Sequence, residues 1–166
     1  MKFRPCIDIH NGKVKQIVGG SLLDQGDQAV ENFAADQEAD YFANLYKKDG
    51  LKGGHVILLN PSTSEYYPET KKQALKALQT YQDGLQIGGG ITAENAEEYM
   101  KAGASHVIVT SYVFKNGEIY WDNLQNLCDA VGKEHVVLDL SCRKKDEKYY
   151  ICLLYTSDAA DDRISV

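Results

Sequence analysis

Two carboxylates stand inside apolar segments that are otherwise typical of buried strands. Asp8 lies in Cys-Ile-Asp-Ile and Asp139 lies in Val-Leu-Asp-Leu, and each segment is followed by a polar stretch and a further extended run. Because burying an unpaired carboxylate is costly, an acid at such a position needs water, a partner or a function. Two carboxyl groups in unlike surroundings can divide the roles of general acid and general base. The alternative is two unrelated strand acids, with Asp8 on an exposed edge strand in contact with water.

Glycines and hydroxyl groups follow two other apolar segments. The run Gly88-Gly89-Gly90 precedes a predicted helix that Thr92 would cap, and Thr110 and Ser111 end the next apolar segment. Glycine lets backbone N–H groups approach a ligand closely, and a helix start offers unpaired N–H groups to an anion. We interpret these residues as a phosphate cradle. The alternative is a tight strand-to-helix turn with ordinary Ser/Thr caps.

The cysteines and histidines show no metal-binding pattern. No C-x-x-C pair occurs, and the four histidines are scattered along the chain, as are the four cysteines, Cys6, Cys128, Cys142 and Cys152. This spacing predicts neither a metal centre nor a disulfide framework. We expect the cysteines to be small buried or inert thiols, and we expect no cofactor.

The composition is that of an ordinary globular domain. The chain has 166 residues, 43% hydrophobic and 25% charged, which is enough for one domain with a hydrophobic core. A net charge of -6 argues against a nucleic-acid partner, because phosphate backbones select for clustered Lys and Arg. No apolar run has the length of a membrane span, and no basic-then-apolar leader starts the chain. We therefore expect a cytoplasmic protein that does not bind membranes.

Short apolar segments alternate with helical periodicity along the chain. Ser21–Asp36 is predicted to be an irregular loop, and the buried face of the first helix is predicted to carry Phe42, Leu45 and Tyr46. The run His55–Leu59 is typical of a strand covered on both faces. The predicted strands are Cys6–Ile9, Lys13–Val18, His55–Leu59, Leu85–Ile87, His106–Val109 and His135–Leu140. The predicted helices are Ala39–Lys48, Glu69–Tyr81, Thr92–Ala102 and Asp122–Val131.

This alternation indicates an α/β fold with a parallel sheet and helical crossovers. A doubly wound nucleotide-binding sheet would carry G-x-G-x-x-G after its first strand, and Gly12 alone does not supply that motif. A (β/α)8 TIM barrel places its site residues at the carboxyl ends of many strands. Polar residues at such ends favour the barrel: Asp8, Asn60, Gly88 to Gly90, Thr110, Ser111 and Asp139. Since a complete barrel has ~250 residues, we expect a partial barrel containing only about the first five β/α strands.

Four motifs together resemble the ribotide isomerases of histidine biosynthesis. They are CIDIHNGKVKQIVGG, LQIGGGI, HVIVTS and VVLDLSCRK, and the resemblance runs from Met1 to about Ile151. The family is phosphoribosylformimino-5-aminoimidazole carboxamide ribotide isomerase, in the form found in fungi and some bacteria. The resemblance implies a (β/α)8 barrel built as two similar halves. It also implies an Amadori rearrangement that opens an aminoaldose ribosyl phosphate (ProFAR) to an aminoketose (PRFAR).

The same resemblance implies roles for individual residues. Asp8 would be the base that takes the proton from the sugar C2, and Asp139 the acid that assists opening of the furanose ring. Arg143 matches a basic position near the acid. The residues that fall where the family binds one of the two substrate phosphates are Gly88, Gly89, Gly90, Thr110 and Ser111.

The resemblance also implies a small bis-phosphorylated ribotide as substrate, no metal or other cofactor, and a monomeric intact protein. Two alternatives remain open. One is the sister barrel, the cyclase that makes imidazole glycerol phosphate. The other is a non-catalytic half-barrel that binds phosphorylated ligands or pairs with a second copy.

The end of the chain departs from the family pattern. The segment CLLYTSDAADD, Cys152–Asp162, looks like one reading frame through a sequencing adapter, and Asp158–Asp162 carries no core pattern. We therefore divide the chain into residues 1–151, the N-terminal part of a barrel, and residues 152–166, a non-native tail. The alternative is a genuine divergent C-terminus. A barrel cut after five strands has open sheet edges, so we expect the chain alone to be inactive and poorly soluble.

Overall fold

A computed structural model of the chain describes residues 2–17, 31–115, 118–140, 142–145, 147–152 and 163–165. Its main feature is a seven-stranded sheet. The strands are β1 (Cys6–His10), β2 (Lys13–Ile17), β3 (Glu31–Ala34), β4 (Gly54–Leu58), β5 (Leu85–Gly88), β6 (His106–Val109) and β9 (Val136–Leu138). They lie in the order β3-β2-β1-β4-β5-β6-β9. The strands β1, β4, β5, β6 and β9 are parallel, whereas β2 and β3 extend the sheet in antiparallel fashion.

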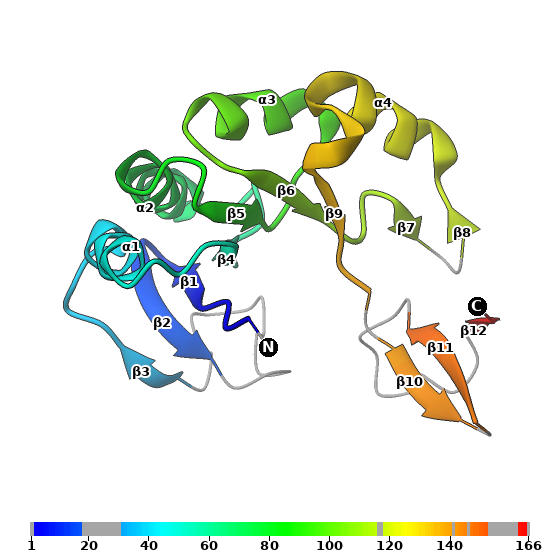
Figure 1. Cartoon of the computed structure of the whole chain (residues 1–166), viewed down its shortest axis with the longest axis horizontal. Coiled ribbons are helices and arrows are strands. Elements are labelled where there is room, and N and C mark those ends of the chain that lie inside the picture. The colour runs from blue at the N-terminus through cyan, green and yellow to red at the C-terminus, as the bar shows by residue number, and fades with distance from the viewer. Residues whose placement is uncertain are drawn as a thin grey trace.

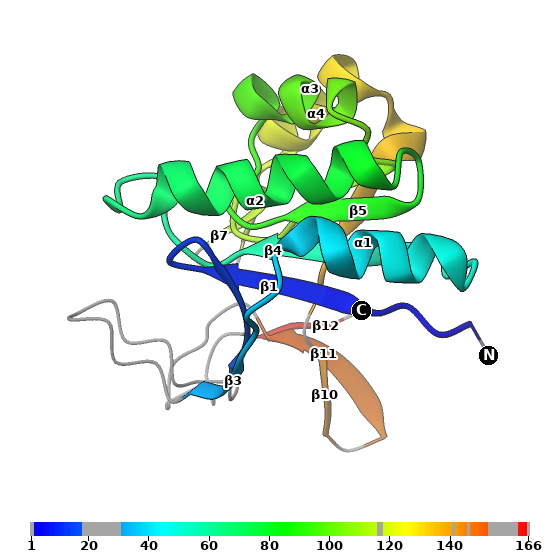
Figure 2. The same cartoon turned by 90° about the vertical axis from the view of Figure 1, so that its left-hand side faces the viewer.

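Four helices connect or precede the parallel strands, and Figures 1 and 2 show all of them on the same side of these strands. They are α1 (Ala39–Lys48), α2 (Tyr67–Thr80), α3 (Ala93–Lys101) and α4 (Trp121–Val131). A doubly wound sheet carries helices on both faces, so the described helices do not form that arrangement. We call the other side of the parallel strands the helix-free face. None of the described helices is both long and apolar enough to cross a membrane.

The hydrophobic core lies between the parallel strands and the helices. Side chains that point to the helices are almost fully buried, as Ile7, Ile9 and Val56 show. The alternate positions, His55 and Ile57 among them, are only half-buried. The expectation that His55–Leu59 is covered on both faces is therefore wrong. Its continuous apolar run conceals an alternation, because helices pack against one face only.

Three further sequence expectations need correction. The predicted loop Ser21–Asp36 contains β3, and three of its four residues pair with the edge of β2; residues 18–30 lie outside the described part. A short hairpin, β7 (Phe114–Lys115) and β8 (Glu118–Ile119), was not predicted, because two-residue strands carry no readable period. Leu45 is 42% exposed. The face of α1 that packs is formed instead by Ala39 and Ala43, with Phe42 and Tyr46 half-buried beside them.

The last described elements form a separate sheet. A 3-10 turn, Lys133–His135, precedes β9, so the fifth parallel strand is shorter than the predicted His135–Leu140. Beyond it, β10 (Cys142–Lys145), β11 (Lys148–Cys152) and β12 (Arg163–Ser165) form a three-stranded antiparallel sheet. This sheet is the orange and red part of Figure 1.

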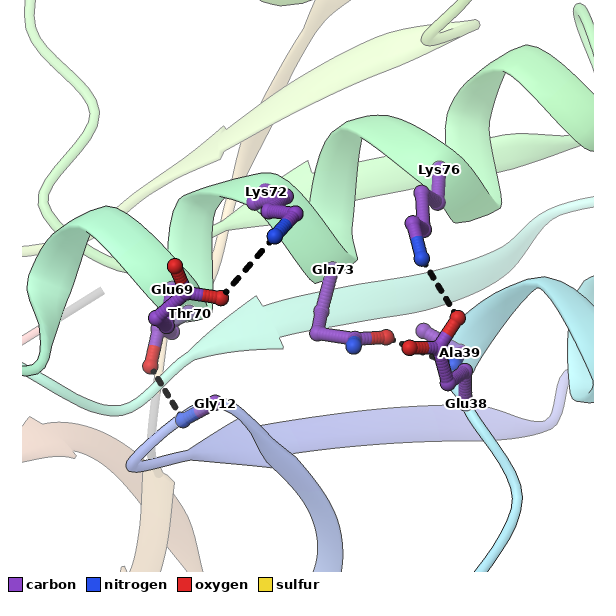
Figure 3. Close-up of polar contacts among 8 residues, drawn as sticks. All are labelled: Gly12, Glu38, Ala39, Glu69, Thr70, Lys72, Gln73 and Lys76. Carbon is purple, nitrogen blue, oxygen red and sulfur yellow. Dashed lines mark hydrogen bonds and ion pairs between the residues drawn. The ribbon is translucent and has the colours of Figure 1, made fainter.

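The start of α1 is capped by a side chain from α2. Glu38 occupies the N-cap position but makes no capping bond with its own side chain. Instead the buried Gln73 accepts a hydrogen bond at Oε1 from the backbone N–H of Ala39, at 3.0 Å (Figure 3). Glu38 also pairs with Lys76. Hydrogen bonds from Lys76 and then Gln73 hold the pKa of the Glu38 carboxyl below its ordinary value. Gln73 thus joins the two helices that cover β1 and β4.

Removing this cap should destabilise the packing of α1. We expect Gln73→Ala to lower the free energy of unfolding by about 1–2 kcal/mol, because it leaves a helix-terminal N–H without its acceptor. Urea unfolding followed by circular dichroism measures this. Gln79→Ala is the matched control, since Gln79 lies on the same helix but is exposed. A Gln73→Ala protein as stable as Gln79→Ala would show that this bond contributes nothing.

Candidate active site

One row of residues crosses the helix-free face at the height of Asp8. In parallel strands, paired residues point to the same face and successive residues alternate. Asp8 is paired with Ile57, Ile57 with Gly88, and Ile108 with Val137. A Cβ built on Gly88 would lie 2.9 Å from Ile57 Cδ1 and 3.2 Å from Ile108 Cβ, which places all three on one face. The row therefore runs unbroken from β1 to β9.

Asp139 lies on the same face, one layer nearer the carboxyl ends of the strands. It follows Val137 by two residues, and its backbone N–H donates to the Val109 carbonyl oxygen at 3.0 Å. Asp8 is half-buried and Asp139 is exposed. Four steps between neighbouring strands, at about 4.8 Å each, put the two acids about 19 Å apart along the sheet. The structure thus places both acids on one face in unlike surroundings, without contact between them.

A polar neighbour of Asp8 comes from its own strand. The thiol of Cys6, two residues earlier and on the same face, donates a hydrogen bond to Asp8 Oδ1 at 2.8 Å. Cys6 is exposed overall, yet its thiol is partly desolvated. Desolvation there, then the hydrogen bond and the charge of Asp8, raise the pKa of the Cys6 thiol far above its ordinary value.

The sequence predicted small buried or inert thiols, and neither of the two cysteines whose side chains are described is fully buried. Cys6 is exposed and Cys128 is half-buried. The side chains of Cys142 and Cys152 lie outside the described part. Composition and spacing could not show that Cys6 lies on the face without helices, since that depends on which side of β1 the helices cover.

The three glycines form a tight turn between β5 and α3. Gly89 and Gly90 have φ angles of +96° and +69°, a region in which glycine is favoured. A Cβ on Gly89 would lie 2.0 Å from the carbonyl oxygen of Leu58, so this turn passes directly against the end of β4. The turn is held by Asn95, whose Nδ2 donates to the Gly90 carbonyl oxygen at 3.0 Å and whose Oδ1 accepts from Thr92 N–H at 2.9 Å.

Asn95 completes a capping box with Thr92, which confirms Thr92 as the cap of this helix. The start of α3 also carries its own anion. Glu94 accepts hydrogen bonds from the Thr92 hydroxyl and from its own backbone N–H, and these lower the pKa of its carboxyl. The N–H groups at the start of α3 therefore already have some hydrogen-bond partners within the protein. For an anion at this turn, the available donors are the glycine backbone and nearby hydroxyl groups.

Thr110 and Ser111 supply such hydroxyl groups at the end of the neighbouring strand. Both are exposed, and β6, which they follow, is hydrogen-bonded to β5. The carbonyl oxygen of Thr110 accepts from the N–H groups of Val113 and Phe114, which turns the chain sharply after β6. The glycine turn and the two hydroxyl residues thus follow adjacent strands. Arg143 lies on β10 opposite Tyr150, and its side chain falls outside the described part.

A buried amide network ties the end of β4 to the turn that follows β1. Asn60 Oδ1 accepts from Asn11 N–H at 2.8 Å and from the Thr70 hydroxyl at 2.7 Å, and Asn60 Nδ2 donates to Asn11 Oδ1 at 2.7 Å. Thr70 Oγ1 accepts in turn from Gly12 N–H at 3.0 Å (Figure 3). Asn11 and Gly12 both have positive φ, as in a type I′ hairpin turn. Asn60 therefore has a structural role in holding this turn. In the sequence, only the pair Asn11-Gly12 indicates that a turn is present there.

Within the described ranges, no three His, Cys, Asp or Glu side chains are placed to hold a metal ion together. The described part is thus an α/β protein with a singly wound parallel sheet. Glycines, hydroxyl residues and Asp139 lie at the carboxyl ends of its strands, and Asp8 lies within β1. The chain belongs to the histidine biosynthesis protein family, which its sequence matches over residues 2–160.

Its relatives include a plant protein and several fungal proteins that carry one enzyme name, 1-(5-phosphoribosyl)-5-((5-phosphoribosylamino)methylideneamino) imidazole-4-carboxamide isomerase. The chain is 54% identical over 155 residues to the one from Medicago truncatula, which is named as chloroplastic, covering 91% of this chain and 48% of the relative. It is 47% identical over 157 residues to the one from Yarrowia lipolytica, covering 92% and 56%. For Neurospora crassa the identity is 41% over 167 residues, covering 99% and 62%. The chain therefore spans about half the length of these relatives.

Proposed function

We propose that this chain is the N-terminal part of an isomerase that converts an aminoaldose ribosyl phosphate to an aminoketose in histidine biosynthesis. The observation that best supports this proposal is that two acids of different exposure, Asp8 and Asp139, lie on the helix-free face. A reaction that needs one general base and one general acid can use such a pair. The isomerase name shared by relatives 41–54% identical supports this reaction over that of the sister cyclase.

We further propose that residues 1–151 are the first five β/α strands of a (β/α)8 barrel. The parallel strands follow one another in sequence order with helices on one side, which is how a barrel wall is built. The strand β9 ends the described parallel sheet, where a sixth strand would pair. In a closed barrel of eight strands, β1 and β9 stand on opposite walls, so Asp8 and Asp139 would face one another across the mouth. Residues 152–166 would be a non-native tail.

In this mechanism Asp139 protonates the ring oxygen as the C1–O bond of the furanose breaks and C1 forms a double bond with nitrogen. Asp8 then removes the C2 proton to give an enol, and the enol becomes the ketone as its hydroxyl loses a proton and C1 gains one. The proton moves between adjacent carbons, so one base and one acid are sufficient. We assign one substrate phosphate to the backbone of Gly88, Gly89 and Gly90 with the hydroxyl groups of Thr110 and Ser111, and a supporting charge to Arg143. We expect a monomeric, cytoplasmic enzyme that uses no cofactor.

Genetic complementation tests the proposal, with a relative supplying the C-terminal part of the barrel. Residues 1–151 are joined to the C-terminal portion of the Yarrowia relative and expressed in histidine auxotrophs that lack either the isomerase or the cyclase. We expect growth only of the strain that lacks the isomerase, and turnover by the purified fusion. Rescue of the cyclase-deficient strain would instead favour the sister activity. A folded fusion that rescues neither strain and binds phosphate would favour the non-catalytic alternative.

The anion already present at α3 leads to a prediction about phosphate affinity. We expect Glu94→Gln to tighten the binding of inorganic phosphate about two- to fivefold, because it removes a negative charge beside the glycine turn. Titration followed by NMR shifts of the Gly88 to Gly90 amides measures this. Glu97→Gln is the control, since Glu97 lies on the same helix and pairs with Lys101 on its exposed surface. Equal affinities in both variants would place the phosphate elsewhere.

A further inference from the structure

We propose that Cys6 is a positioning residue for Asp8: its thiol donates to one carboxylate oxygen and holds the side chain in a single orientation on the helix-free face. The contact is 2.8 Å from Sγ to Oδ1. The two residues are separated by one position on β1, so their side chains emerge on the same face, about 7 Å apart along the strand. The inference deepens the proposed function and rests on it for the catalytic meaning of Asp8.

The backbone that carries this pair is firmly held. Ile7 and Ile9, the residues that alternate with Cys6 and Asp8, are 1% and 0% exposed. The strand β1 pairs with β2 on one side and with β4 on the other. The positions of Cys6 and Asp8 are therefore fixed by packing from the opposite face. What remains to be fixed is rotation about the bonds of the Asp8 side chain, and a hydrogen bond to Oδ1 restricts that rotation.

The surroundings keep the thiol in its donor form. A thiolate beside the Asp8 carboxylate would place two negative charges within hydrogen-bond distance, and the raised pKa of Cys6 reflects that cost as well as desolvation. Cys6 is thus unsuited to act as a nucleophile, which requires a stabilised thiolate. It is well suited to donate. The residue paired with Asp8 on β4 is the apolar Ile57, and the thiol donates to the carboxylate at 2.8 Å.

Orientation of this kind matters for a general base. Proton abstraction requires a carboxylate oxygen aligned with the C–H bond, and small misplacements of reacting groups reduce rates strongly. With Oδ1 engaged by the thiol, Oδ2 is the oxygen that would receive the substrate proton. The hydroxyl of a serine at position 6 could donate in the same way, whereas an alanine could not.

Thiol alkylation tests the contact directly on the chain itself. Rates with iodoacetamide are measured at each cysteine by mass spectrometry from pH 6 to 10, with Cys128 as the internal reference. We expect wild-type Cys6 to react slowly for an exposed thiol. Asp8→Asn should accelerate Cys6 alkylation at pH 8 about tenfold, because lowering a thiol pKa by one unit raises its thiolate fraction tenfold. The rate at Cys128 should not change. The control Asp49→Asn, at the exposed C-cap of α1, should leave both rates unaltered.

Turnover of the fusion described above tests the positioning role. Cys6→Ala should lower kcat about tenfold at unchanged KM, and Cys6→Ser should restore most of the loss. Equal kcat in wild type and Cys6→Ala, or equal Cys6 alkylation in wild type and Asp8→Asn, would overturn the proposal. If Asp8 protects Cys6 but the wild-type fusion shows no turnover, the proposed function fails and the catalytic role of Cys6 fails with it. The contact itself then stands.

Discussion

The Asp8→Asn variant of the fusion is expected to lose about two to four orders of magnitude in kcat, the range typical of a missing general base. The change is nearly isosteric and leaves an amide that cannot accept the sugar C2 proton. Asp8 is half-buried on a strand whose core side carries Ile7 and Ile9, so the fold should be retained. Steady-state kinetics with the aminoaldose ribotide measures the loss, and circular dichroism checks the fold.

Measuring the phosphate affinity of the variant distinguishes a loss of catalysis from a loss of substrate binding. The phosphate cradle is proposed on other strands, so phosphate affinity should change less than about threefold in Asp8→Asn. Asp139→Asn should show a comparable loss if it is the acid of the pair, whereas Asp49→Asn should retain full activity. A variant at Asp8 that keeps more than one-tenth of wild-type kcat would contradict the assignment of the base. A large rise in KM alone would make Asp8 a binding residue.

Replacing Gly89 should have the largest effect on stability. We expect Gly89→Ala to lower the free energy of unfolding by at least ~3 kcal/mol, or to abolish folding, because its Cβ has no space. The nearest atoms belong to the backbone of β4: the Leu58 carbonyl oxygen would lie 2.0 Å from the new carbon. No side-chain rotation can relieve a clash with backbone, so β4 and β5 would have to separate. The φ angle of +96° adds strain for any L-residue.

Gly90→Ala is the matched comparison for this variant. Gly90 has a similar positive φ of +69°, but a Cβ there meets no atom within 4 Å. Its cost should be limited to backbone strain of about 1–2 kcal/mol. Urea unfolding of both variants measures the difference, and equal stabilities would mean that the turn does not pass against Leu58. Because Gly90 is exposed, its variant also allows phosphate binding to be measured on a folded protein.

Local signals in the sequence predicted the elements that depend on local energetics. The helix Ala39–Lys48 has the bounds that its periodicity predicts, and the strand at His106–Val109 likewise. The capping residue Thr92 was identifiable because its partner is only three residues away. By contrast, β3 depends on the unpaired edge of β2. The outward position of Leu45 depends on how α1 packs against α2.

The sequence by itself determined an α/β chain with parallel strands, two acids within strands and a glycine turn after the third parallel strand. This was possible because strand and helix periods, caps and glycine runs depend on residues that are close together in the sequence. Only the tertiary structure decided that the helices cover one face, that both acids lie on the other, and that the Cys6 thiol reaches Asp8. It also decided that Asn60 serves the hairpin turn of Asn11. These features depend on contacts between residues that only folding brings together, or on which face of a strand the helices cover, and no local pattern specifies either.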